Sequence, residues 1–123
     1  MADEPLDEAA VTAILGLGDA GVGAELIAQF VEDTQTRLDE LIGALAAGEL
    51  ALVARAAHTL RGSAASFGAR SMVPLTMELE ASAGRGDVVA AAELVDDLVA
   101  RFGHVRSELE RLSAEADGAR ERD

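Results

Sequence analysis

Apolar residues recur along this chain at the three- and four-residue spacing of amphipathic helices, and the pattern predicts helices with almost no strand. The clearest pattern occupies the last third of the chain, at Val88, Ala91, Val95, Leu98, Phe102, Val105, Leu109 and Leu112. Its steps alternate between three and four residues, which is typical of the seam of a bundle or coiled coil. We therefore predict a long last helix that Asp87 caps and that ends near Leu112.

The first half of the chain predicts two helices. A short helix covers about residues 6–15 and ends in the glycine-rich stretch 16–23. A long helix follows over about residues 24–47, and Gly48 ends it. Its inner stripe consists of Ile27, Phe30, Val31, Thr34, Leu38, Leu41, Ile42 and Leu45.

Two more helices are predicted in the middle of the chain. One covers about residues 49–67, before Gly68, and its buried face consists of Val53, Ala57, Leu60, Ala64 and Phe67. The other covers about residues 71–83, with Ser71 as its N-cap and Pro74 tolerated in its first turn. Its inward residues are Met72, Leu75 and Leu79.

The connections between the long helices are short, so neighbouring helices should be antiparallel. The predicted fold is all-α: an antiparallel up-down-up-down four-helix bundle with a short extra N-terminal helix. We expect one domain over residues 1–112 and a polar, flexible C-terminal tail over residues 113–123. Because the seam residues are used inside a single bundle, we expect a monomer.

Composition excludes several classes of function. The chain has 123 residues, enough for one domain with a sizeable core, and it lacks cysteine, which excludes disulfides and thiolate metal sites. A formal net charge of −13 argues against binding to nucleic acid or anionic membranes. No apolar run approaches the roughly 20 residues of a membrane span, and the acidic N-terminus lacks the features of a signal peptide. We therefore expect a cytoplasmic protein.

His58 is the candidate reactive residue. It lies in the helix predicted over residues 49–67, roughly 140° from Val53 and therefore off the buried face. Its neighbours one turn away are small or cationic, and they are Ala54, Arg55, Arg61 and Gly62. Such a surface lets a partner come close and favours an anion.

Gly62 and the two arginines each have an alternative explanation. A glycine inside a helix costs about 1 kcal/mol relative to alanine. Gly62 reflects a tight helix crossing, neutral drift, or a bare patch through which a partner reaches the imidazole. Arg55 and Arg61 are either ordinary solvated charges or a binding site for a phosphoryl group on His58. In the second case the phosphoryl group would lie about 5 Å from an arginine. At an effective dielectric of about 20 that attraction is about 3 kcal/mol per unit charge, and less in open solvent. Because these residues surround one exposed histidine in an acidic protein, the functional interpretation is favoured.

Three segments resemble a known family. The run from Ala57 to Ala69, A-H-T-L-R-G-S-A-A-S-F-G-A, is similar to the signature of histidine-containing phosphotransfer (HPt) domains, roughly A-H-x-L-K-G-S-S-x-x-x-G-A. Residues 75–87 resemble the family's L-x-x-x-L-E-x-x-A-x-x-G-D segment, and residues 26–33 resemble the helix ahead of its histidine. The similarity covers about residues 6–112.

The resemblance implies a phosphoryl carrier without catalytic machinery of its own. Such a protein takes a phosphoryl group from the phospho-aspartate of a response-regulator receiver domain, or from a histidine kinase, and passes it to another receiver. His58 would be phosphorylated through its outward ring nitrogen, Arg61 would steady the phosphoryl group, and Gly62 would give the receiver room. Ser63 and Ser66 are candidates for hydrogen bonds near the site, although Ser63 has the alternative of bonding within its own helix.

This chain departs from the family pattern at two positions. Arg61 replaces the more usual lysine, which keeps the charge but changes the geometry of its hydrogen bonds. Ala64 replaces the second serine of the motif, so any role of that hydroxyl is missing.

Glu80 is a further candidate for the site. In relatives that are fused to chemotaxis kinases, a glutamate at this spacing accepts a hydrogen bond from the inner imidazole nitrogen and fixes the tautomer. The alternative is a solvated helix glutamate. His104, which lies off the seam of the last helix, is interpreted as a surface residue without a role.

Other activities fit the sequence poorly. It has no phosphate-cradling glycine-rich loop between a strand and a helix, no Glu-x-x-His pair for a di-iron site and no serine elbow, so we expect neither a metal nor a cofactor. The serious alternative is an adaptor or inhibitor that binds a receiver or kinase without phosphorylation of His58. In either case the partner surface should combine the His58 face with exposed residues of the helix over residues 24–47. Arg55 and Arg61 there would complement the acidic pocket of a receiver.

Overall fold

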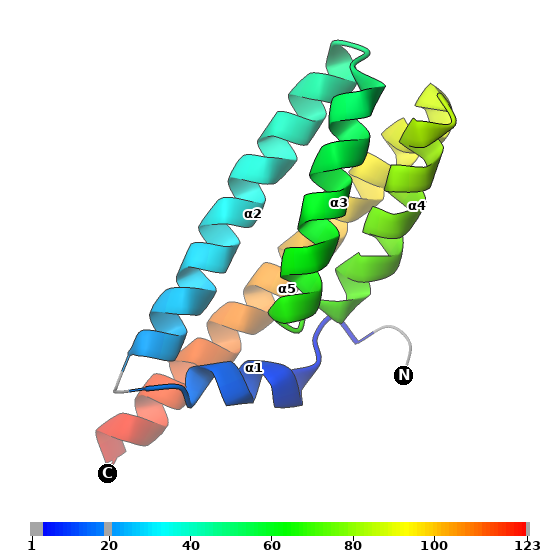
Figure 1. Ribbon diagram of the computed structural model, residues 1–123. Coiled ribbons are helices and arrows are strands. Elements are labelled where there is room, and N and C mark those ends of the chain that lie inside the picture. Colours follow the sequence, from blue (N-terminus) through cyan, green and yellow to red (C-terminus); the bar gives the residue numbers. More distant parts are fainter. Residues whose placement is uncertain (1–3, 19–20, 123) are drawn as a thin grey trace.

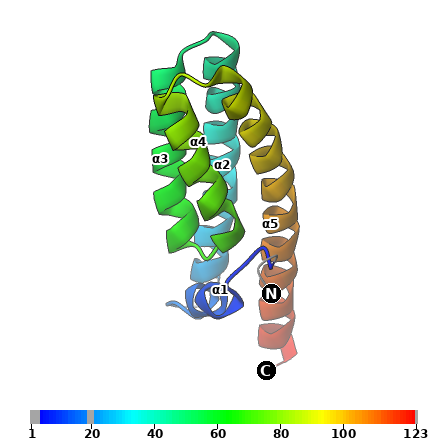
Figure 2. The ribbon, with the colours of Figure 1, turned by 90° about the vertical axis from the view of Figure 1, so that its right-hand side faces the viewer.

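The computed structural model describes residues 4–18 and 21–122, with the backbone alone for residues 120–122. Along this part of the chain it contains α1 (Glu8–Leu15), α2 (Val22–Ala46), α3 (Leu50–Ser66), the short 3₁₀ helix η1 (Arg70–Met72), α4 (Val73–Gly84) and α5 (Val88–Arg122), and no strand. The four long helices form an antiparallel bundle in the order α2, α3, α4, α5 around its axis (Figures 1 and 2). The predicted up-down-up-down fold is confirmed.

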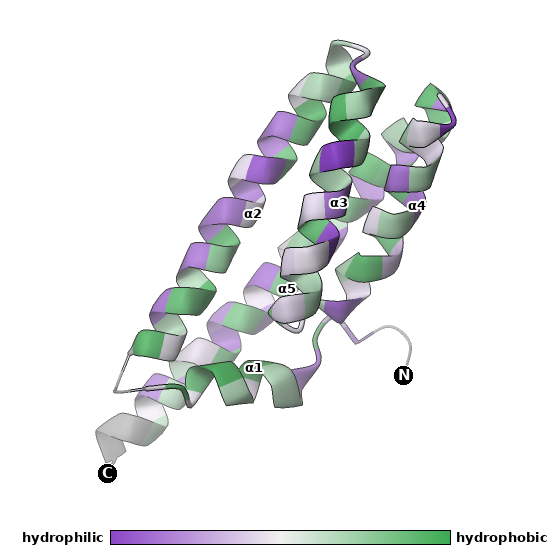
Figure 3. Cartoon of the chain, viewed as in Figure 1, coloured by the Kyte–Doolittle hydropathy of each residue, from purple (hydrophilic) through white to green (hydrophobic). Residues whose placement is uncertain are grey.

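The core of the bundle consists of the stripes that the apolar spacing predicts. Fully buried side chains come from every long helix, and the largest include Leu38, Leu41, Val53, Leu60, Leu79, Leu98, Val105 and Leu109. Apolar and polar residues alternate along α2 and α3 in Figure 3, as expected of helices with one buried face. Among the described residues, no helix combines the length and the apolar character needed to span a membrane.

The short helix α1 lies across one end of the bundle, against α2 and α5 (Figures 1 and 2). The Asp7 side chain caps it by accepting from the N–H of Ala10 at 3.2 Å, and the N–H of Asp7 donates to the carbonyl of Gly68 at 2.8 Å. Gly68 ends α3 with φ of 74°, and a Cβ there would lie 3.0 Å from the carbonyl oxygen of Asp7. Glycine therefore lets the end of α3 pack against the N-terminal segment.

Most inward positions are confirmed, with two exceptions. Ile42 and Val88 are 45% and 50% exposed. Leu41 takes the core position of its turn, and the next residue points about 100° further round the helix, so Ile42 faces outward. Val88 is the first residue of α5, at the end of the bundle. Four further positions are only partly buried, at Val31, Leu45, Phe67 and Leu75.

The start of α4 differs from the prediction, whereas the start of α5 agrees with it. Ser71 is not an N-cap, because it lies within η1 and its hydroxyl donates to the carbonyl of Pro5 at 3.0 Å. The N-cap of α4 is Met72, and Pro74 lies in the first turn as expected. Asp87 accepts from the N–H of Ala90 at 3.1 Å, which confirms the predicted cap of α5.

The predicted end of the last helix near Leu112 is wrong, because α5 continues to Arg122. The added residues are mostly alanine, glutamate and arginine, which are strong helix formers despite their polarity. Arg111 also donates along this helix to Glu108 at 2.7 Å and to Glu115 at 2.8 Å, and these hydrogen bonds raise the pKa of its guanidinium. The flexibility expected for residues 113–123 and the domain boundary at residue 112 stay predictions.

Candidate functional site

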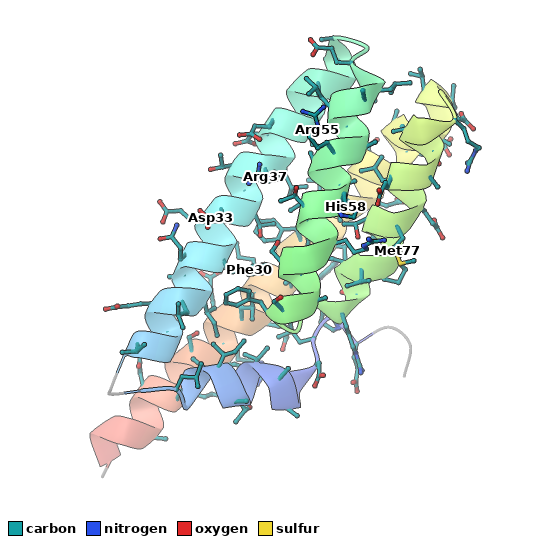
Figure 4. The ribbon with its side chains drawn as sticks, viewed as in Figure 1. Phe30, Asp33, Arg37, Arg55, His58 and Met77 are labelled. Carbon is teal, nitrogen blue, oxygen red and sulfur yellow. The ribbon has the colours of Figure 1, made fainter. Side chains whose placement is uncertain are left out.

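His58 lies on the side of α3 that faces α4, with its side chain 60% exposed (Figure 4). The opposite side of α3 is fixed in the core by Val53, Ala57, Leu60 and Ala64, all of which are buried. Because these residues set the rotation of the helix, the imidazole is directed away from the core, as its position in the apolar pattern predicts.

Glu80 of α4 contacts the inner nitrogen of this imidazole. Nδ1 of His58 lies 3.3 Å from Oε1 and 3.2 Å from Oε2 of Glu80, whose side chain is 34% exposed. The contact depends on α3 and α4, which pack against each other more extensively than any other pair of helices. The structure therefore brings together two residues that the sequence left as a possible pair.

Arg61 completes a three-residue cluster, which we call the His58 cluster: His58, Arg61 and Glu80. Nη2 of Arg61 lies 3.3 Å from Nδ1 of His58, and its Nη1 lies 3.8 Å from Oε1 of Glu80. All of these contacts fall on the inner side of the ring. Within the described chain, no hydrogen bond or ion pair engages Nε2, so the outward nitrogen faces solvent.

Gly62 exposes backbone one turn beyond His58. A Cβ at this position would meet no other atom within 4 Å, apart from the helix itself and the chain neighbours. Packing of the bundle therefore does not require glycine here, and the tight helix crossing considered from the sequence is wrong. What the glycine provides is an open surface beside the imidazole.

The two serines of the motif bond within α3 and do not reach the imidazole. The hydroxyl of Ser63 donates to the carbonyl of Leu60 at 3.3 Å, and that of Ser66 donates to the carbonyl of Gly62 at 3.0 Å. For Ser63 this is the alternative that the sequence left open. Both hydroxyls are therefore satisfied within the helix that carries His58.

Arg55 lies one turn before His58 and is exposed (Figure 4). It forms no ion pair with a carboxylate among the described residues, whereas Arg37 of α2, at the same groove between α2 and α3, pairs with Glu40 at 3.5 Å. Arg37 and Arg55 thus line this groove, whereas Arg61 lies on the flank of α3 that faces α4, beside Glu80. Arg37 was not predicted from the sequence, because nothing in the local pattern of α2 indicates which helix it faces.

A second groove between α2 and α3 lies on the flank of α3 that faces α2, and it was not predicted from the sequence. It has a volume of about 190 Å³, and its lining includes Leu26, Phe30, Thr34, Thr59, Ser63 and Phe67. The rings of Phe30 and Phe67 stack there with centroids 4.8 Å apart. Thr34 is 2% exposed, yet its hydroxyl oxygen has no hydrogen-bond partner. Leu26, 41% exposed, stands at the edge of this α2–α3 groove.

Other polar clusters do not suggest a second reactive site. Over the described residues, no group of three or more histidine and carboxylate side chains is placed to hold a metal ion. His104 is exposed on α5, which does not adjoin α3 in the bundle.

Comparisons with known proteins point to one family. The family model described as Hpt domain matches residues 25–115. The crystal structure of histidine-containing phosphotransfer protein B (HptB) from Pseudomonas aeruginosa PAO1 is similar, with a TM-score of 0.84 and 26% sequence identity over 92% of this chain and 97% of that chain. No curated protein matches the sequence.

Proposed function

Because this chain belongs to the Hpt domain family and serves phosphotransfer in a two-component phosphorelay, we propose that His58 is the residue that carries its phosphoryl group. One observation carries the proposal: His58 is exposed, with its inner nitrogen beside a carboxylate and its outward nitrogen open to solvent. This is the arrangement that a nucleophilic imidazole needs.

The chemistry follows from the two ring nitrogens. When Nδ1 keeps its proton and donates it to Glu80, the lone pair of Nε2 is available to attack phosphorus. The N–P bond forms while the P–O bond to the partner's aspartate breaks, and the electron pair of that bond stays on the released carboxylate. The ring then carries a positive charge, which the carboxylate of Glu80 stabilises.

Arg61 supplies positive charge close to the new phosphoryl group. The attraction between the guanidinium and the phosphoryl group is at most about 3 kcal/mol per unit charge at a separation of about 5 Å. Because the site is exposed, solvent reduces this attraction toward about 1 kcal/mol. This contribution affects how tightly a phosphorylated partner binds and how fast it transfers. The rest of the machinery belongs to that partner, so we propose that the chain has no catalytic activity by itself.

The partner surface extends from the His58 cluster across Gly62 to the α2–α3 groove. Gly62 removes the side chain that would otherwise separate a receiver from the imidazole. Arg55 offers an unpaired charge to the acidic pocket of a receiver, and exposed Leu26 offers apolar contact. A single chain contains the whole surface, and we propose that it acts as a monomer.

The experiment that tests the proposal is phosphoryl transfer from a panel of labelled phospho-receivers to the wild-type protein and to its His58→Gln variant. We expect a base-stable, acid-labile label on the wild type and none on the variant. A variant that accepts label as the wild type does would refute His58 as the carrier. Binding of a receiver without any label on either protein would instead indicate an adaptor.

A further inference from the structure

The inner nitrogen of His58 faces two side chains with opposite hydrogen-bonding requirements. Nδ1 lies 3.2 and 3.3 Å from the carboxylate oxygens of Glu80 and 3.3 Å from Nη2 of Arg61. A carboxylate only accepts and a guanidinium only donates, whereas each nitrogen of a neutral imidazole does one or the other. The two contacts therefore cannot be hydrogen bonds at the same time, and each belongs to a different tautomer of the ring.

The two tautomers differ in reactivity at the outward nitrogen. When Nδ1–H donates to Glu80, Nε2 has a free lone pair in the plane of the ring. When Nδ1 accepts from Arg61, the proton lies on Nε2, which then cannot attack phosphorus. Arg61 also lies 3.8 Å from Oε1 of Glu80, so its guanidinium competes with the Nδ1 proton for the same carboxylate.

We propose that Arg61 is a positioning residue that holds part of the unphosphorylated protein in the unreactive tautomer and releases it when an anionic phosphoryl donor arrives. This inference rests on the proposed role of Nε2 as the nucleophile. The Arg61 side chain is 36% exposed, so the guanidinium has room to turn toward an anion beside Nε2. Its departure leaves Glu80 as the partner of Nδ1, and the ring gives up the Nε2 proton to solvent while Nδ1 takes one up.

Transfer then proceeds from the reactive tautomer. Nε2 forms its bond to the phosphorus of the partner's aspartyl phosphate, and the P–O bond breaks with its electron pair left on the aspartate carboxylate. Nδ1 keeps its proton and donates it in a hydrogen bond to Glu80. Arg61, now on the outer side, pairs with the phosphoryl oxygens. The same guanidinium thus lowers the reactivity of the resting imidazole and stabilises the phosphorylated one.

The tautomer ratio can be measured without any phosphorylation, by ¹⁵N NMR of the ring nitrogens at a pH at which the imidazole is neutral. Arg61→Met removes the hydrogen-bond donor but keeps a long, unbranched side chain. In this variant we expect the ratio of Nδ1–H to Nε2–H at His58 to rise roughly threefold, which is the size of effect expected for a partly exposed charged contact. Arg61→Lys should restore the wild-type ratio, and the ring of His104 serves as an internal reference. Equal ratios in the wild type and in Arg61→Met would overturn the proposal.

Glu80→Met supplies the opposite test, because it removes the acceptor. We expect its ratio to fall below that of the wild type, and an unchanged ratio would contradict the competition between Glu80 and Arg61. These results are independent of the labelling experiment. If His58 takes the label and its tautomer ratio is the same in the wild type and in Arg61→Met, only the present inference fails. If the tautomer ratio changes in Arg61→Met and His58 takes no label, the proposed carrier role fails.

Discussion

The carboxylate of Glu80 lies 3.2 Å from Nδ1 of His58, although 22 positions separate the two residues along the chain. The contact joins α3 to α4 at the level of the exposed imidazole, and it fixes which ring nitrogen faces inward. A histidine that depended only on its own helix would turn freely about its side-chain bonds. The pair therefore links the packing of two helices to the chemistry of one nitrogen.

Replacement of Glu80 by glutamine should slow phosphorylation of His58 roughly tenfold, because the neutral amide orients the ring and stabilises its positive charge less well. The rate of label transfer from a phospho-receiver measures the effect. Glu78→Gln, on an exposed position of the same helix, is the matched control and should keep the wild-type rate. Equal rates for the two variants would show that Glu80 does not assist the transfer.

Gly62 should affect stability and transfer in opposite directions. Since a side chain there meets no neighbour, Gly62→Ala should raise the free energy of unfolding by about 1 kcal/mol in urea denaturation. Gly62→Gln should remain folded but slow transfer from a receiver at least about tenfold, because its side chain occupies the surface beside His58. Gly103→Gln tests an equally open helical glycine on α5, and a comparable loss of transfer there would argue against a specific role for Gly62.

Reversal of the charge at Arg61 should weaken transfer without unfolding the bundle. Arg61→Glu replaces an attraction of about 1 kcal/mol by a repulsion of similar size, and we expect a decrease of about tenfold or more in the rate. Arg106→Glu makes the same charge change on α5 and should have little effect. If Arg61→Glu transferred the phosphoryl group at the wild-type rate and kept the wild-type circular dichroism spectrum, Arg61 would have no role in the transfer.

The buried hydroxyl of Thr34 should reduce the stability of the free protein, because it is removed from water without a hydrogen-bond partner. Thr34→Val keeps the shape and should raise the free energy of unfolding by about 1 kcal/mol. Thr76 is equally buried, but its hydroxyl donates to the carbonyl of Val73 at 2.7 Å, so Thr76→Val should lower the stability by a similar amount. Urea denaturation of both variants measures the difference, and effects of the same sign would contradict this explanation.

Features that depend on local periodicity could be predicted from the sequence. The apolar spacing located the helices and placed His58 off the core, because each residue advances the helix by about 100° wherever the helix sits. Asp87 could be identified as a cap for the same reason, since its acceptor and the N–H of Ala90 lie within one turn. Ser71 shows the limit of such local reasoning, because its hydroxyl finds a partner at Pro5, far away in the sequence.

The sequence by itself therefore determined the helical bundle, the exposed histidine and, through the family motif, the phosphorelay function. Only the tertiary structure decided that Glu80 reaches Nδ1, that Arg61 lies on the inner side of the ring, and that Gly62 faces open space. The tertiary structure also decided that Thr34 is buried without a partner beside a groove. The physical reason is that the rotation and spacing of neighbouring helices are set by the packing of the whole core, whereas an amphipathic pattern specifies only which side of each helix faces inward.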